Sequence, residues 1–192
     1  MFTFPAEGSS LSTPAAFSFG YRIRPALPKD DYNILKIMNR AVADLKDKSL
    51  FIPDDLSLIR SILDSEGFGL IALDYQDNPV AYLLVLFPRL SPENLGYDLG
   101  FSEKQLLQAA HMDSLAVYPE HRGRRLQKSL ITRAEKLLDF TYPYRLATVS
   151  PQNSASLKSF LDCGYEIQLT KEKYGGHIRH ILMKSAVSKP PE

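Results

Sequence analysis

The sequence predicts one mixed α/β (α+β) domain, in which helices cover both faces of a central sheet. Its 192 residues are 44% hydrophobic, enough to bury one continuous core. Strand-like and helix-like segments alternate in the order β-α-α-β-β-β-α-β-α-β-β, and neither a repeat nor a Gly-, Pro- or Ser-rich linker divides them. We therefore expect a single domain over residues 21–184, a flexible extension over 1–20 and a frayed tail over 185–192.

The chain enters this domain through a strand and two helices. Tyr21–Arg24 has the pattern of a short strand. A proline and two aspartates follow, the residues that begin helices, so we expect a helix over roughly residues 31–46. Apolar residues recur at helical spacing after Pro53, which predicts a second helix that ends at Gly67 and Gly69.

The middle of the chain predicts a hairpin, an inserted loop and a further strand. Two apolar segments flank the turn residues 76–79, and their continuous apolar character predicts strands covered on both faces. Residues 91–109 are polar and turn-rich, so we expect a loop with one short helix. The segment "HMDSLAVYP", residues 111–119, reads as a strand that a proline ends.

The last third predicts two helices, a strand and a closing hairpin. Apolar residues recur along one face from Leu126 to Leu138, which indicates an amphipathic helix. "YRLATVSP" is expected to form a strand, and the helix after it ends at Gly164. The final two strands should turn at Gly175 and Gly176.

The composition excludes several classes of protein. Lys and Arg number 23 and Asp and Glu 22, so the overall charge gives no support for a nucleic-acid or membrane partner. The single cysteine, Cys163, excludes an internal disulfide and fits a reducing compartment, so we expect a cytoplasmic protein. No secretory signal or bilayer-spanning stretch is visible. The four histidines are not spaced as ligands of one ion, and we expect no metal.

The segment "YPEHRGRRLQKSL", residues 118–130, places four cations and Gly123 between a strand and a helix. A loop of this kind presents free backbone N–H groups and the positive end of a helix dipole, an arrangement that binds phosphate. A basic helix start that faces only solvent, or a nucleic-acid contact, are the alternatives. The glycine spacings of the P-loop and of the dinucleotide-binding loop are both absent here.

Two motifs resemble those of the GNAT superfamily of acyl-CoA-dependent N-acyltransferases. "LAVYPEHRGRRLQKSLITRAEKLL" resembles the family's acyl-CoA-binding strand, loop and helix, and "VSPQNSASLKSFLDCGYE" resembles its second motif downstream. The resemblance implies a mostly antiparallel sheet, splayed after the fourth strand. It also implies transfer of an acetyl or short acyl group from acetyl-CoA to a primary amine by direct attack in a ternary complex.

The resemblance also implies a set of residues that bind CoA through backbone N–H groups and neighbouring side chains. They are Leu115, Ala116, Val117, Arg122, Gly123, Arg124, Arg125, Leu126, Gln127, Asn153 and Phe160. Asn153 is equally placed to cap its helix. Arg125 stands where the family usually has a second glycine, and we expect it to take a helical φ.

The base that would deprotonate the amine is expected on the strand before the basic loop. Strand periodicity puts His111, Asp113, Leu115 and Val117 on one face, which makes the first two the candidate bases. The alternatives are that Asp113 occupies a bulge or pairs with a cation, that His111 lies at the surface, and that a water chain acts as the base.

The acid for the leaving thiolate is not evident, because Phe160 stands where many family members have a tyrosine. Tyr165, Tyr174 or solvent would supply the proton, or the protein binds CoA with little or no catalysis. The acceptor is expected to be a small-molecule or peptide amine. Acidic residues of the connecting loops, Asp54 among them, favour a cationic acceptor, and both a monomer and a homodimer are open.

Overall fold

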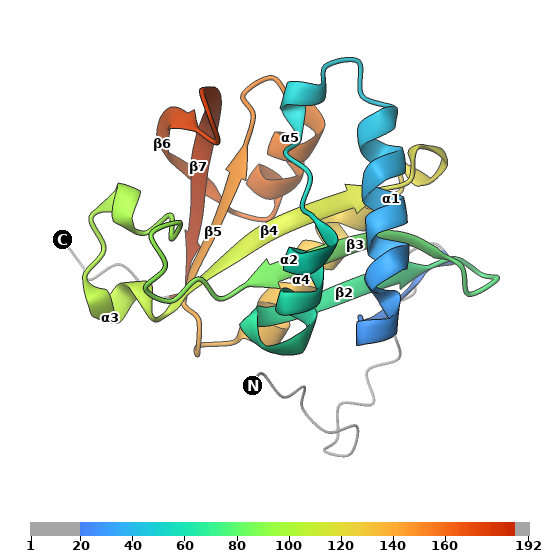
Figure 1. Ribbon diagram of the computed structural model, residues 1–192, viewed down its shortest axis with the longest axis horizontal. Helices are drawn as coiled ribbons and strands as arrows, with labels where there is room; N and C mark the ends of the chain where they lie inside the picture. Colours follow the sequence, from blue (N-terminus) through green and yellow to red (C-terminus); the bar gives the residue numbers. More distant parts are fainter. Residues whose placement is uncertain (1–19, 187–192) are drawn as a thin grey trace.

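A seven-stranded sheet lies at the centre of the computed structural model, which describes residues 20–186. The strand order is β1-β2-β3-β4-β5-β7-β6, and every neighbouring pair is antiparallel except β4 and β5 (Figure 1). The strands are β1 Arg22–Pro25, β2 Gly67–Leu73, β3 Pro79–Leu86, β4 Ala109–Val117, β5 Tyr144–Val149, β6 Glu166–Lys173 and β7 His177–Ser185. The mixed, mostly antiparallel sheet expected from the sequence is confirmed.

The ends of the chain fall mostly outside the described residues. The extension expected over residues 1–20 lies outside up to residue 19, and so does the part of the expected tail from residue 187. Strand β7 continues to Ser185, one residue beyond the expected end of the domain. No helix among the described residues combines the length and apolar character needed to cross a membrane.

Helices cover both faces of the sheet, as the sequence predicts. They are α1 Asp31–Ala43, α2 Leu56–Ser61, α3 Glu103–Leu106, α4 Leu126–Leu138 and α5 Ser154–Asp162. Helices α1 and α2 pack on one face, where Ile34 and Ile59 meet Tyr82 of β3 (Figure 1). Helices α4 and α5 pack on the other face, and α3 lies in the inserted loop before β4.

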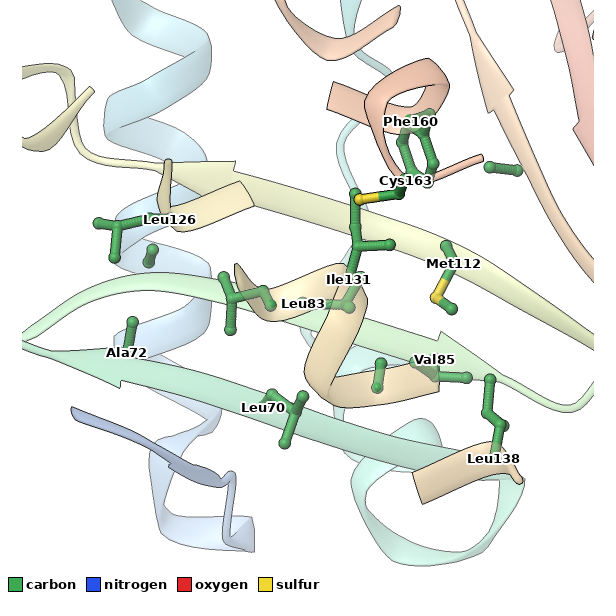
Figure 2. Close-up of a cluster of buried hydrophobic side chains, with 14 of the residues drawn as sticks. Leu70, Ala72, Leu83, Val85, Met112, Leu126, Ile131, Leu138, Phe160 and Cys163 are labelled. Carbon is green, nitrogen blue, oxygen red and sulfur yellow. The ribbon is translucent and has the colours of Figure 1, made fainter. Parts of the chain in front are cut away.

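The core beneath α4 follows from the spacing of its apolar residues. Leu126, Ile131 and Leu138 point down onto β2 and β3, where they meet Leu70 and Val85 (Figure 2). Each of these side chains is almost fully removed from water. Burial of one such side chain contributes about 1.5–3 kcal/mol, so this face holds the basic loop before α4 firmly to the sheet.

The glycines after α2 have a different role from the expected one. Helix α2 passes into a π-helical turn over Ile62–Glu66, and β2 already begins at Gly67. A Cβ at Gly67 would lie 1.9 Å from the carbonyl oxygen of Val85, and one at Gly69 would lie 2.9 Å from the Cβ of Ala26. Gly69 therefore lies inside a strand, and both glycines permit close packing rather than ending the helix.

The sheet opens between β4 and β5. Their parallel pairing covers only Ala109 to His111 on β4 and Tyr144 to Leu146 on β5. Beyond this point the two strands diverge, so the splay expected after the fourth strand is confirmed. The β5-facing backbone edge of residues 112–117 consequently has no strand partner within the described residues.

Candidate active site

A bulge in β4 determines which side chains face the opening between β4 and β5. Ser114 lies opposite Leu84 of β3, and Met112 lies opposite the next residue, Val85. Asp113 is therefore an extra residue without a partner on β3. The alternation of side chains along the strand inverts at this point, and the carboxylate projects from the unpaired edge.

The expectation that alternate residues from His111 to Val117 share one face is wrong, because the bulge inverts the pattern. Val117 packs with the α4 face, whereas His111 lies on the opposite face of the sheet. His111 is 5% exposed, and its Nε2 accepts a hydrogen bond from the backbone N–H of Leu95 at 3.2 Å. Burial and then the charge of Lys173 lower its pKa to about 3, so the imidazole is neutral.

A cavity of about 380 Å³ lies between the end of α1, the edge of β4, the basic loop and the starts of α4 and α5. It contains most of the residues that the resemblance assigned to CoA: Leu115, Ala116, Val117, Arg122, Gly123, Arg125, Leu126, Gln127 and Asn153. Asn153 also caps α5, because its Oδ1 accepts a hydrogen bond from the Ser156 amide at 3.2 Å. The two exceptions, Arg124 and Phe160, lie elsewhere.

The basic loop holds two residues in the left-handed region. Gly123 has φ +74° and Arg125 has φ +60°, so the helical φ expected for Arg125 is wrong. A side chain in this region costs about 1–2 kcal/mol, which explains why a glycine is favoured at this point in the motif. Within the described residues the amides of Gly123, Arg124 and Arg125 donate to no acceptor.

Arg122 contributes less to this set of donors than expected. Its backbone N–H donates to the carbonyl of Pro119 at 3.2 Å and is therefore occupied by a turn. Its guanidinium pairs with Asp44 at 2.6 Å and also reaches the carbonyl of Ala41 at 3.4 Å. The Arg122 side chain thus ties the loop to the end of α1.

Several residues around this cavity escaped the sequence reasoning. Nδ1 of His121 lies 2.8 Å from the hydroxyl of Tyr21, and the Arg124 guanidinium lies 5.9 Å from the centre of the same ring. His121 lines the cavity, as does Phe51 from the connection between α1 and α2. The only sequence signal for His121 was its place inside the basic motif, since its partner lies 100 residues away.

A second, smaller cavity of about 140 Å³ adjoins the first. The two share Phe51, Leu115, Gln127 and Asn153 as lining residues. The polar lining of the smaller cavity is Asp54, Asp113, Gln127, Thr148, Ser150, Asn153, Ser156, Tyr174 and Arg179. Of the residues expected to act as base or acid, the structure brings Asp113 and Tyr174 together here, with Phe160 beside them.

Asp113 and Asp54 influence each other across the smaller cavity. The Asp113 side chain is exposed to solvent, but protein atoms pack densely around its carboxyl group. Burial in these surroundings, together with the charge of Asp54, raises its pKa to about 7. Burial also raises the pKa of Asp54, whose Oδ2 is buried without a hydrogen-bond partner among the described residues.

The two candidate tyrosines occupy different environments. The Tyr174 hydroxyl lies 3.1 Å from Oγ1 of Thr148, and burial raises its pKa. Tyr165 is 2% exposed and packs edge-on against Phe160 with ring centres 5.1 Å apart. It lines neither of the two cavities. No cluster of three His, Cys, Asp or Glu side chains within residues 20–186 is placed to hold a metal ion.

Comparison with solved structures defines the class to which this architecture corresponds. No protein-family model matches the sequence, and no curated protein matches it significantly. The structure matches yncA of Salmonella typhimurium, solved with acetyl-CoA, at a TM-score of 0.65 and 16% identity over 90% of this chain and 97% of that one. It matches the ribosomal-protein-S18-alanine N-acetyltransferase of Escherichia coli at 0.64 and 15%, again over 90% and 97%.

A third match is a GNAT-family acetyltransferase of Streptococcus pneumoniae, with a TM-score of 0.63 and 15% identity over 86% of this chain and 98% of that one. The protein thus has the fold of a class of acyltransferases, the GNAT N-acetyltransferases. The loop and helix that carry the first sequence motif border the larger cavity.

Proposed function

We propose that this protein transfers an acetyl or short acyl group from acetyl-CoA to a primary amine by direct attack in a ternary complex. One observation carries this proposal. The cavity bordered by the basic loop joins, at Leu115 and Asn153, a smaller cavity that contains a carboxyl group with a pKa near neutrality. A thioester that lies along the first cavity would thus meet an amine held in the second.

The larger cavity fits the chemistry of CoA. The amides of Gly123, Arg124 and Arg125 are free for an acceptor, and the start of α4 adds the positive end of its dipole. Such charge-assisted hydrogen bonds contribute about 1.5–3 kcal/mol each, which suits a pyrophosphate. The unpaired edge of residues 112–117 offers backbone groups to the amides of a pantetheine arm.

Asp113 is the base in this proposal. An alkyl ammonium has a pKa of about 10.4, more than three units from neutrality at pH 7, so a nearby base lowers the barrier to attack. With a pKa of about 7, Asp113 is about half ionised at neutral pH and holds a captured proton well. His111 does not serve here, because it lies on the other face of the sheet and is bound to Leu95.

Tyr174 is the acid in this proposal. Its hydroxyl lines the smaller cavity, and its raised pKa keeps the proton in place until a thiolate forms. Phe160 lies in the same wall but has no proton to give. Tyr165 is enclosed in the core beneath α4, away from both cavities.

A thermal-shift and thiol-release experiment tests the proposal. Acetyl-CoA should raise the melting temperature of the purified protein, and free CoA thiol should appear only when an amine is added. The amine panel includes small amines, amino acids, aminoglycosides and peptide N-termini. A protein whose melting temperature does not respond to acetyl-CoA would contradict both the cofactor and the reaction.

A CoA-binding protein with little catalysis is the second candidate. Two features favour it: Arg125 occupies a left-handed position that suits glycine, and Phe160 occupies the place of the usual tyrosine. The same experiment separates the two functions. A rise in melting temperature without thiol release from any amine would support the binding protein.

A further inference from the structure

The smaller cavity contains a buried cation, Arg179, whose charge interacts with Asp47, a residue that does not line the cavity. Arg179 of β7 is 4% exposed and forms no ion pair within residues 20–186. Its Nη2 donates to the carbonyl of Ser49 at 2.6 Å, and its Nη1 donates to that of Ile178 at 2.9 Å. Two backbone carbonyls use two of the five guanidinium N–H groups, so the others remain able to donate to a ligand.

A half-buried carboxyl group that lacks a cationic partner, Asp54, lines the same cavity. Asp54 forms no ion pair with any described residue, and its Oδ2 has no hydrogen-bond partner among them. Asp113 is a second carboxyl group in the lining of this cavity. Asp54, Asp113 and Arg179 line this one cavity and form no ion pair with each other, so it presents both acidic and basic groups.

Buried charges without partners are unfavourable unless a ligand compensates them. A single molecule compensates both the acidic and the basic groups of this cavity only if it carries an ammonium and a carboxylate. The cavity also limits its size, since about 140 Å³ corresponds to the volume of about five water molecules. Apolar side chains complete the wall, namely Leu50, Phe51, Ile52 and Met112.

We propose that the acceptor is a compact amino-carboxylate, a small α-amino acid, whose carboxylate binds Arg179 and whose amine lies toward Asp54 and Asp113. This inference rests on the proposed acyl transfer and names its substrate class. The amine nitrogen forms a bond to the thioester carbonyl carbon while the carbon–sulfur bond breaks. One ammonium proton passes through Asp113 to solvent, the second ends on the CoA thiol, and an N-acyl amino acid is released.

The experiment compares L-alanine with L-alaninamide and with tri-alanine, using acetyl-CoA and a thiol-release assay. Alanine should have a kcat/KM at least about 30-fold above that of alaninamide, the effect expected when one member of a buried charge pair is removed. The amine of alaninamide loses its proton more readily than that of alanine. A higher kcat/KM for alanine is therefore attributable to its carboxylate. Tri-alanine should resemble alaninamide.

Arg179→Gln should remove this preference. The variant should lose most of its kcat/KM for alanine and much less for alaninamide, so that the ratio between the two acceptors collapses. Arg145→Gln is the matched control, because Arg145 is also a buried arginine that donates to a carbonyl, that of Asp139 at 2.7 Å, and lines neither cavity. That variant should keep the preference whatever happens to its stability.

Each outcome decides the inference. It is overturned if alaninamide or tri-alanine equals alanine in the wild-type protein, which would indicate an amide-linked N-terminus as acceptor, or if Arg179→Gln keeps the preference. If Arg179→Gln does not fold, Arg179→Lys is used, whose single ammonium should lower the ratio. If acetyl-CoA binds but no amine releases thiol, the proposed transfer fails, and the amino-acid site is judged by whether alanine but not alaninamide raises the melting temperature of the CoA-loaded protein.

Discussion

Asp54, from the connection between α1 and α2, and Asp113, from the bulge of β4, line one cavity, and the charge of the first helps to raise the pKa of the second to about 7. The two carboxyls come from segments about sixty residues apart in the sequence and from different layers of the fold. This pairing gives the candidate site a base that titrates near neutral pH, and it leads to the first two predictions.

Asp54→Asn should change how kcat/KM depends on pH. The rise of kcat/KM on the acidic side of the pH profile, its acid limb, should move to lower pH. Removal of the Asp54 charge lowers the pKa of Asp113, so the base is ionised at a lower pH than in the wild type. Burial of Asp113 remains and keeps its pKa above the ordinary range. Asp64→Asn, at an exposed position in the π-helical turn, should leave the limb in place. An unmoved limb in Asp54→Asn would mean that another group titrates.

Asp113→Asn should lower kcat/KM by on the order of a hundredfold or more, the usual contribution of a positioned base. The variant should also lose the acid limb near pH 7. Its melting-temperature response to acetyl-CoA should persist, because the basic loop lines the larger cavity and Asp113 lines only the smaller one. Full activity in the variant would support a water chain as the base.

Asp113→Asn should also change how stability depends on pH. The folded-state pKa of Asp113, about 7, lies above its unfolded value, so the folded protein binds the extra proton between about pH 4 and pH 7. This group therefore makes the wild-type protein less stable as the pH rises through that window. The asparagine variant should gain melting temperature relative to the wild type at pH 8, and this advantage should shrink at pH 5 and vanish near pH 4, measured by thermal unfolding in matched buffers.

Gly123→Ala and Arg125→Gly should have opposite effects on stability. Both residues have φ near the left-handed minimum, and an added Cβ at Gly123 would meet no atom within 4 Å. Alanine at 123 should therefore cost about 1 kcal/mol through the backbone alone, whereas glycine at 125 should stabilise by about 0.5–1 kcal/mol once its greater freedom in the unfolded chain is counted. Chemical unfolding measures both changes.

The same two variants report on the loop as an anion site. Arg125→Gly should tighten the binding of acetyl-CoA, because it removes a Cβ and a long side chain from a loop that lines the larger cavity and whose amides at 123–125 have no acceptor among the described residues. Gly123→Ala should weaken acetyl-CoA, since it disturbs the conformation that aims those amides. Weaker binding in Arg125→Gly would instead identify the Arg125 guanidinium as a phosphate ligand.

The parts of the site that could be predicted are those encoded in continuous sequence. The strand, the loop with Gly123 and the start of α4 follow one another within about twenty residues, so local patterning and the family resemblance located the larger cavity together. The backbone of Arg125 was not predicted, because a helical φ was expected where the structure has a left-handed one.

The smaller cavity could not be predicted in the same way. Asp54, Asp113 and Arg179 come from three separate segments that meet only in the folded protein, where Arg179 of β7 also donates to Ser49 of the η2 segment, Lys48–Leu50. The bulge was equally hidden, since an extra residue in β4 is defined by its register against β3 and not by its own sequence. Period-two reasoning along β4 therefore placed His111 on the wrong face.

The bulge also divides β4 into two parts that differ in their strand partners. Before Asp113, Ala109 to His111 pair with β5, whereas Ser114 to Val117 pair with β3 alone, and Leu115 to Val117 line the larger cavity. Deletion of Asp113 would leave Met112 and Ser114 as consecutive residues opposite Val85 and Leu84, which is the register of a regular ladder, so it would remove the bulge and the carboxyl together. Substitution at 113 leaves the ladder intact, because this residue takes no part in it. Position 113 is thus the point on this strand where the chemistry of a side chain can be exchanged without altering the architecture that supports it.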